Sequence, residues 1–204
     1  MADTTTLTGP GGARMDVDAE DARILDAVLA VSATGSLEDD PRGAVAREAG
    51  ITVGQLRERY PDLRELLVDA LRWRDDRGIE GMDTNERDGR GLLRSFLAIA
   101  RGNVEAPGTV ALFTTLSAAA TSPDHPGHEY FAERYAWLRG ILVDALRELE
   151  EEGELIDGAD PLSIATQTIA LLDGLQVQWL LDRAAVDMSA LVRGFLDVWL
   201  LDPL

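Results

Sequence analysis

The sequence has no cysteine and no lysine, and aromatic residues make up only 5% of its 204 positions. The absence of cysteine excludes disulfides and thiolate-bound metals. Every one of the 19 basic residues is an arginine, and 37 acidic residues outnumber them to give a formal net charge of −18. Such a charge argues against a protein that binds nucleic acid through an overall positive surface.

Long apolar runs are also missing. About eighteen consecutive apolar residues are needed to span a bilayer, and Asp173 interrupts the best candidate, IALLDGLQVQWLL. The first 18 residues are polar, rich in Gly and Thr, and lack the apolar segment of a signal peptide, so we expect them to form a disordered tail. These features predict a cytoplasmic protein without a membrane partner.

Apolar residues recur at helical spacing along almost the whole chain. Strict alternation, the pattern of half-buried strands, is rare, so the predicted fold class is all-α. The first helix, about 21–33, carries Ile24, Val28 and Val31 on one face. The other predicted helices span about 41–49, 52–60, 62–76, 91–104, 108–121, 127–152, 161–182 and 188–200.

The ends of the second and third helices are the clearest local signals. Asp40 is placed to accept a backbone N–H, Pro41 occupies the first helical position, and Gly50 suits a left-handed stop. Two residues later, Thr52 and Gln55 have the spacing of a capping box, in which each side chain bonds the other residue's backbone N–H. Two short helices separated by a tight turn are therefore predicted.

A Gly- and Asp-rich stretch, RGIEGMDTNERDGRG, marks a boundary near residues 78–90. We expect a tail over residues 1–18, a compact unit of short helices over 19–77, and a larger helical domain over 78–204.

The helix over 161–182 is apolar on nearly every side, so it needs a second covering surface besides its own domain. A second copy of the chain, packed through the last two helices as a four-helix bundle, is the simplest supplier. Gly174 would permit close approach of the two helices. The predicted interface residues are Leu172, Leu175, Trp179, Leu191, Phe195, Val198 and Trp199.

The order of these elements resembles the tetracycline-repressor (TetR) family. The resemblance is carried by AREAG, a turn, TVGQL, an aromatic residue with Pro, and DLRELL, and by the two terminal helices. It covers the chain from about residue 21 onward. It implies an N-terminal three-helix helix-turn-helix head that binds operator DNA, joined by a fourth helix to a larger C-terminal domain that dimerises and binds a small effector.

The residues that the resemblance assigns to DNA lie in and beside the third helix. Its start falls on Thr52, Val53, Gly54 and Gln55, of which Thr52 and Gln55 are expected to reach base edges in the major groove. Arginines would contact phosphates, and a Tyr ring would anchor the helix. The complete predicted set is Arg42, Thr52, Val53, Gly54, Gln55, Arg57, Arg59 and Tyr60. Each arginine could also be an ordinary surface charge, and Gln55 only a capping residue.

Local charge decides whether this head can meet DNA. Residues 41–60 contain four basic and two acidic residues, whereas residues 21–75 contain eight basic and eleven acidic ones. Charges much farther away than about 8 Å are screened at physiological salt, so acids of the C-terminal domain hardly matter. Glu38, Asp39 and Asp40, at the start of the second helix, are close enough to oppose a phosphate.

Aromatic and polar residues of the middle helices are candidates for an effector pocket, because binding cavities are mostly apolar with a few polar groups. They are Trp73, Phe96, Phe113, Thr114, Tyr130, Tyr135, Trp137 and Gln176. The same residues could form an ordinary core. His125 and His128, the only histidines, could bind a metal with Asp124 or shape a loop, and the loop is the preferred interpretation.

The resulting hypothesis is a ligand-responsive transcriptional regulator, a repressor released from operator DNA by a small apolar effector, with no cofactor. The alternative is a dimeric ligand- or protein-binding module of the same fold whose acidic head no longer binds DNA. No nucleophile, base and orienting group occur at recognisable spacing, so an enzyme is not predicted.

Overall fold

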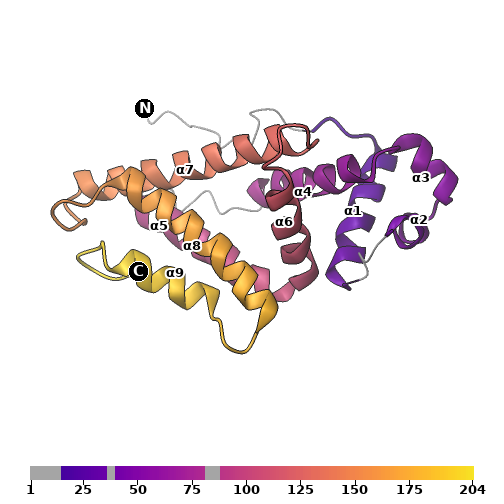
Figure 1. Ribbon diagram of the computed structural model, residues 1–204. Coiled ribbons are helices and arrows are strands. Elements are labelled where there is room, and N and C mark those ends of the chain that lie inside the picture. Colours follow the sequence, from indigo (N-terminus) through magenta and orange to yellow (C-terminus); the bar gives the residue numbers. More distant parts are fainter. Residues whose placement is uncertain (1–14, 36–39, 81–87) are drawn as a thin grey trace. The chain divides into compact units, whose positions relative to one another are not determined.

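The computed structural model describes residues 15–35, 40–80 and 88–204 (Figure 1). These residues confirm the all-α fold class, since their only strand-like pairing is an isolated bridge between Leu155 and Leu200. The helices are α1 (Ala19–Ala33), α2 (Arg42–Ala49), α3 (Val53–Arg59), α4 (Leu63–Glu80), α5 (Gly89–Gly102), α6 (Pro107–Ala119), α7 (His128–Glu151), α8 (Pro161–Leu181) and α9 (Met188–Asp197), with a 3₁₀ turn η1 (Asn103–Glu105).

The described residues divide into two compact units. The first combines those among residues 1–82 with residues 115–134, and the second combines those among 83–114 with residues 135–204. The sequence predicted a boundary near 78–90, but it gave no sign that residues 115–134 pack with the N-terminal helices. The division therefore falls within α6 and again within α7, because both helices contain residues of each unit.

Polar side chains cap the helices largely as the sequence predicts. Gly50 closes α2 in the left-handed region, with φ of 70°, as predicted. The N-cap of α2 is Pro41, however, one residue later than the predicted Asp40, which still accepts the backbone N–H of Arg42 at 3.1 Å. At the start of α1, Asp18 accepts the N–H groups of Glu20 and Asp21 at 2.9 and 2.8 Å. Asp18 is thus the N-cap of α1, whereas the sequence placed it in the tail; the predicted tail over residues 1–14 lies outside the described residues.

The first unit has its core between α1, α2 and α4, with α3 packed on α2 (Figure 1). Fully buried apolar side chains come from each helix, among them Val28 of α1, Val45 of α2, Leu56 of α3 and Leu71 of α4. This core holds the two short helices and the turn between them against a longer helix.

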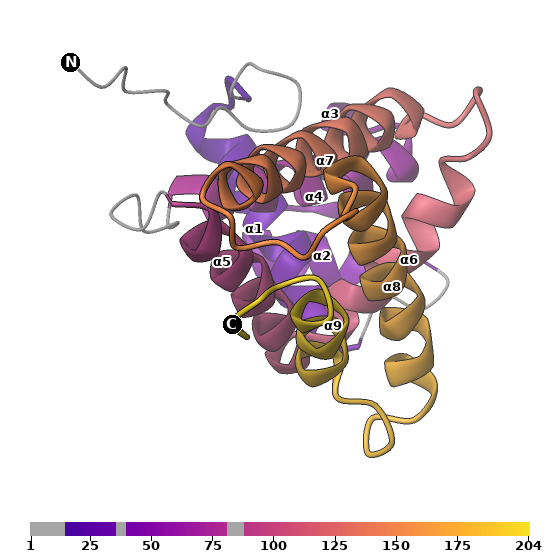
Figure 2. The ribbon, with the colours of Figure 1, turned by 90° about the vertical axis from the view of Figure 1, so that its left-hand side faces the viewer.

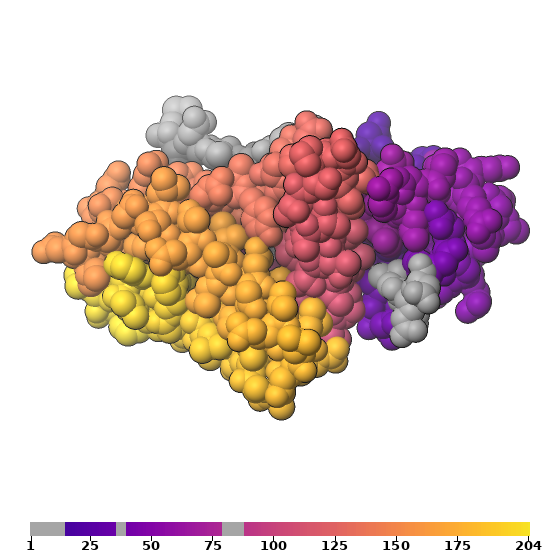
Figure 3. Space-filling view, viewed as in Figure 1, coloured from indigo at the N-terminus to yellow at the C-terminus, as the bar shows by residue number. Residues whose placement is uncertain are grey.

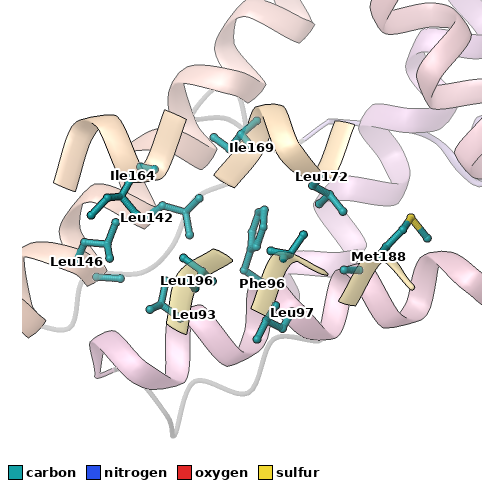
Figure 4. Close-up of a cluster of buried hydrophobic side chains, with 14 of the residues drawn as sticks. Leu93, Phe96, Leu97, Leu142, Leu146, Ile164, Ile169, Leu172, Met188 and Leu196 are labelled. Atoms are coloured by element: carbon teal, nitrogen blue, oxygen red, sulfur yellow. The ribbon is translucent and has the colours of Figure 1, made fainter. Parts of the chain in front are cut away.

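The second unit is built around α5, α7, α8 and α9, which all contribute to one apolar cluster. In Figure 4, Phe96 of α5, Leu146 of α7, Leu172 of α8 and Leu196 of α9 converge in it. Helix α9 lies beside both α5 and α8, as Figures 1 and 2 show. The four helices therefore surround an almost entirely apolar interior.

A buried polar cluster fastens α4 to the first turns of α7 within the first unit. The Asp75 carboxylate accepts hydrogen bonds from the Tyr130 hydroxyl at 2.7 Å and from Arg134 Nε at 2.6 Å. Arg74 forms an ion pair with its other oxygen at 3.1 Å. The Asp75 and Arg134 side chains are only 12% and 13% exposed, so water screens this ion pair weakly.

Burial by itself would raise the pKa of the Asp75 carboxyl group, but the neighbouring Arg134 and Arg74 guanidinium groups outweigh burial and lower it. A carboxyl group whose pKa is lowered by folding stabilises the protein above its unfolded pKa, which is about 3.9. That stabilisation disappears as the pH falls through the folded pKa.

We expect Asp75→Asn to lower the free energy of unfolding at pH 7 by about 3 kcal/mol, because it leaves the Arg134 charge buried without its carboxylate. The difference from the wild type should stay constant between pH 7 and 5 and shrink below about pH 4, where the wild-type carboxyl group becomes protonated. Urea unfolding at several pH values measures both effects. Asp26→Asn, which breaks the exposed ion pair with Arg77, is the matched control and should cost much less.

Candidate nucleic-acid interface and ligand-binding core

Helix α3 has only seven residues and is fixed at its start by the predicted capping box. Thr52 Oγ1 accepts the backbone N–H of Gln55 at 3.2 Å, and Gln55 Oε1 accepts the backbone N–H of Thr52 at 2.9 Å. The Leu56 side chain in the middle of the helix is fully buried. These contacts fix the orientation of α3 on the first unit.

The other end of α3 is held by a cluster of ion pairs that the sequence did not predict. Arg59 bonds the carboxylates of Asp18 and Asp21 at the start of α1, with its Nη2 to Asp21 Oδ2 distance at 2.8 Å. Glu20 adds a third carboxylate at 3.8 Å. We call Arg59, Asp18, Glu20 and Asp21 the Arg59 clamp. Arg59, predicted to contact a phosphate, thus already has carboxylate partners within the chain.

Two ionisable side chains at this end of α3, Asp18 and Tyr60, have shifted pKa values. The backbone N–H of Asp21 lowers the pKa of the Asp18 carboxyl group, and the Arg59 guanidinium adds to this effect. Tyr60, predicted to anchor the helix, is half-buried, and its pKa is raised first by burial and then by the nearby Asp21. Burial and the nearby Asp21 carboxylate therefore both favour the neutral form of the Tyr60 side chain.

The two other arginines predicted to contact phosphates differ in exposure. Arg42 is only 18% exposed and is held by Asp40 at 3.4 Å and by the carbonyl oxygen of Pro61 at 3.3 Å. Arg57 is 62% exposed, and among the described residues its nearest carboxylate oxygen, from Asp40, is 4.0 Å away. Arg57 is consequently the arginine of α3 that is best placed to meet a phosphate.

The exposed residues of α3 and its N-cap are Thr52, Gly54, Gln55, Arg57, Glu58 and Arg59, whereas the predicted contact residue Val53 is half-buried. The structure thus brings most of the predicted DNA-contact residues to one short helix.

The eight predicted pocket residues are divided between the two units. Trp73 and Tyr130 belong to the first unit, where the Trp73 indole N–H donates to Asp26 at 2.9 Å and Tyr130 bonds Asp75. The other six belong to the second unit: Phe96, Phe113, Thr114, Tyr135, Trp137 and Gln176. Phe96 is part of the buried apolar cluster, and Phe113 is also buried.

Polar groups gather on one side of α8 in the second unit. The Tyr135 hydroxyl donates to Asp173 Oδ2 at 2.7 Å, and Gln176 follows Asp173 by three residues, so both side chains lie on the same side of the helix. Gln176 is buried, and its Oε1 atom has no hydrogen-bond partner among the described residues. The sequence missed Asp173 as a site residue, although it is the only charged residue of α8.

The remaining predicted pocket residues are less suited to a ligand. The Thr114 hydroxyl bonds carbonyl oxygens of its own helix, at 3.0 Å to Ala111 and 3.1 Å to Val110. Trp137 is partly exposed.

The predicted dimer residues separate into buried and exposed groups. Leu172, Leu175 and Trp179 are buried in the core of their own unit, because they lie on the side of α8 that faces the apolar cluster. They therefore present little surface to a second copy. Phe195 and Trp199 pack edge to face and are partly exposed, while Leu191 and Val198 are exposed.

Other exposed apolar side chains on the last two helices were not predicted. They are Leu162, Val177 and Leu181, all on α8, and Leu181 is 84% exposed. Figure 3 shows the orange atoms of α8 and the yellow atoms of α9 forming one continuous surface in this unit. We call the exposed residues Leu162, Val177, Leu181, Leu191 and Val198 the α8–α9 face.

The two histidines shape the loop before α7. His125 Nδ1 accepts the N–H of Gly127 at 3.1 Å, and His128 Nδ1 lies 2.8 Å from the carbonyl oxygen of Ala120. Among the described residues, no three His, Cys, Asp or Glu side chains are grouped so that they could hold a metal ion. None of the helices in the described ranges is long and apolar enough to cross a membrane.

Residues 88–200 match the family described as BetI-type transcriptional repressor, C-terminal. The chain belongs to the TetR family. Members of this family are transcriptional regulators, not enzymes. The match covers the C-terminal domain, and the order of helices in the first unit fits the helix-turn-helix head of the same family.

Solved structures agree with this assignment at the level of the fold. A TetR-family regulator from Rhodococcus sp. is 24% identical, with a TM-score of 0.68, covering 89% of this chain and 99% of that one. A regulator from Saccharomonospora viridis in complex with choline is 19% identical, with a TM-score of 0.67 over 87% and 93% of the two chains. Thermus thermophilus FadR in complex with lauroyl-CoA is 17% identical, with a TM-score of 0.56 over 86% and 91%. No curated protein matches the sequence.

The Arg59 clamp should stabilise the regulator's first unit, whereas the exposed Arg57 should not. We expect Arg59→Ala to lower the Tm measured by circular dichroism at low salt, and Arg57→Ala to leave it almost unchanged. The loss caused by Arg59→Ala should become smaller at 1 M salt, where ions screen the clamp in the wild type. Equal Tm values for the two variants at low salt would contradict a structural role for Arg59.

Proposed function

We propose that this regulator binds operator DNA as a homodimer, represses transcription, and leaves the operator when a small, mostly apolar effector occupies the core of its second unit. The observation that carries the proposal is the exposed side of α3. It presents Arg57, Thr52 and Gln55 on a helix whose orientation is fixed by its cap, its buried Leu56 and the Arg59 clamp.

The strongly acidic composition is compatible with DNA binding for two reasons. Several acids nearest to α3 are already paired with arginines, as Asp18 and Asp21 are with Arg59, and Asp62 with Arg64 at 2.6 Å. Acids farther away than about 8 Å contribute little at physiological salt. The binding that remains should be weak and strongly dependent on salt, because few arginines are free to displace counterions from phosphates.

The α8–α9 face supports the homodimer. An exposed apolar surface of this kind on a soluble chain is typical of an interface, and a second copy supplies a matching surface by symmetry. Gly174 of α8 has open space where a Cβ atom would be, which leaves room for a partner helix.

The effector proposal rests on the interior of the second unit. An apolar cluster with a small polar group, formed by Tyr135, Asp173 and Gln176, has the composition of a ligand site. Gln176 Oε1 lacks a partner among the described residues, and a bound molecule could supply one. The structural relatives in complex with choline and with lauroyl-CoA show that this fold accommodates ligands of very different size.

Ligand and DNA can affect each other only if the ligand binds one conformer of the chain more tightly than another. We propose that α4, which follows α3 directly, moves between these conformers and changes the spacing of the two recognition helices in the dimer. The buried Asp75–Arg134 pair would carry this movement between α4 and α7, because it leaves little freedom for one helix to shift without the other.

The second candidate function is a dimeric binding module of the same fold that no longer binds DNA. The pairing of Arg42 and Arg59 with carboxylates of the same unit favours it, since these two arginines are then less available to phosphates. The two functions differ in one measurable property, which is sequence-dependent binding of the chain to DNA.

We expect the purified regulator to bind DNA from upstream of its own gene at 50 mM salt, with a dissociation constant that rises steeply with salt. Arg57→Ala should weaken binding about tenfold and reduce the slope of log affinity against log salt by about two, because each protomer of the dimer loses one phosphate contact. Fluorescence anisotropy measures both quantities. Arg101→Ala, which removes an exposed arginine of α5, is the control for net charge and should change neither.

Absence of any sequence-dependent binding at 50 mM salt would overturn the regulator proposal in favour of the binding module. An equal loss of affinity in the Arg57 and Arg101 variants would show that only net charge matters, and would rule out α3 as the interface.

Substitutions on the α8–α9 face test whether the chain forms the proposed dimer. We expect Val177→Glu combined with Leu191→Glu to convert the dimer to a monomer, because both side chains are about half exposed and each added charge would be buried against the partner. Sedimentation velocity at micromolar concentration measures the change. Val104→Glu, at a similarly exposed apolar residue of η1, is the control and should remain dimeric. A monomeric wild type would contradict the proposal.

A further inference from the structure

The side-chain amide of Gln55 has a fixed orientation. Its Oε1 atom lies 2.9 Å from the backbone nitrogen of Thr52 and 2.9 Å from Thr52 Oγ1. The oxygen and nitrogen of a glutamine amide are similar in size, so they are distinguished by their hydrogen-bond partners. A backbone N–H can only donate a hydrogen bond. The atom that faces it must therefore be the oxygen, and the Nε2 amide group must point the other way.

The two hydrogen bonds leave the Gln55 carbonyl with no capacity for another partner. A carbonyl oxygen has two lone pairs, and here one accepts the Thr52 N–H while the other accepts the Thr52 hydroxyl proton. The Thr52 hydroxyl donates its proton to Gln55 Oε1 and uses a lone pair to accept the Gln55 backbone N–H at 3.2 Å, so the two bonds do not compete. The Gln55 side chain therefore presents only its two Nε2 protons to a partner.

Those protons are available on the exposed side of α3. Gln55 is an exposed residue, and no hydrogen bond joins its Nε2 atom to any part of the chain that the structure describes. The neighbouring Gly54 has no side chain to cover them. The cap and an outward contact therefore use different atoms of one amide and do not compete.

The bases differ in the hydrogen-bond acceptors and donors that they present to such a donor in the major groove. Adenine is normally read by glutamine through two bonds, one of which needs the amide oxygen to accept from adenine N6. With that oxygen already occupied, the N6 protons of adenine would face the donor protons of Nε2. Thymine offers a single acceptor, whereas guanine offers two adjacent acceptors, N7 and O6, and no donor.

We propose that Gln55 specifies a guanine in each half of the operator, with its Nε2 group donating to guanine O6 and N7. This proposal rests on the proposed DNA binding through α3 and adds the base that α3 prefers. Thr52 sets the preference indirectly, as a positioning residue, because its N–H and hydroxyl hold the Gln55 oxygen away from the groove.

The sharpest test reverses the polarity of residue 55 without removing the cap. Gln55→Glu keeps an oxygen for the Thr52 N–H, since glutamate is equally suited to a capping box, and places its second oxygen where Nε2 was. An acceptor at that point should favour cytosine, whose N4 group is a donor. We expect the selected base to change from guanine in the wild type to cytosine in Gln55→Glu, at one position of each half-site.

The experiment is selection of bound fragments from random DNA with the full-length wild type and three variants. Gln55→Ala should reduce the preference for guanine at that position from about tenfold to almost none and leave the other positions unchanged. Arg57→Ala is the control: it should weaken binding to all sequences and retain the guanine preference, because a phosphate contact carries no base information. Circular dichroism of each variant checks that the head remains folded.

Adenine at this position in the wild type, or the same consensus for the wild type, Gln55→Ala and Gln55→Glu, would overturn the assignment while leaving DNA binding intact. A wild type that enriches no sequence at all is a different result, because it would overturn the proposed function and the base assignment together.

Discussion

The structure depends on fixing a helix that is too short to be stable alone. An isolated helix of seven residues is not populated in water, because the cost of forming its first turn is not recovered over so few hydrogen bonds. Helix α3 is instead held at three points: the Thr52–Gln55 cap at its start, the buried Leu56 in its middle, and the Arg59 clamp at its end. Every proposal about DNA depends on this fixed orientation.

The acidic composition acquires a physical role in this arrangement. Acids such as Asp18, Asp21 and Asp75 are partners of arginines that hold helices together, and so they do not simply oppose a polyanion. A charge count along the sequence cannot distinguish a paired carboxylate from a free one. The acidic chain can therefore carry a small reading surface, provided that Arg57, whose side chain is more exposed than that of Arg59, lies on it.

Features set by neighbouring residues could be predicted from the sequence, and features set by distant residues could not. The caps at Gly50 and Thr52 follow from spacing within a few residues, and the structure confirms them, whereas the predicted N-cap at Asp40 is wrong by one residue because Pro41 takes that position. The partner of Arg59 is 38 residues away in the chain, so the sequence offered only an exposed arginine. In α8, a helix that is apolar on nearly every side, periodicity could not separate the residues that face the core, such as Leu172, from those that face outward, such as Leu181.

The most direct test of the central claim is amide hydrogen exchange in α3 of the free protein, measured by NMR. The Leu56 and Tyr60 N–H groups donate to the carbonyl oxygens of Thr52 and Leu56 at 3.0 and 2.8 Å. If α3 is fixed at both ends, both amides should exchange slowly, with protection close to that of Val28 in the core of α1. Exchange at the rate of an unstructured peptide, while Val28 stays protected, would show that the reading helix is not preformed and would contradict the account.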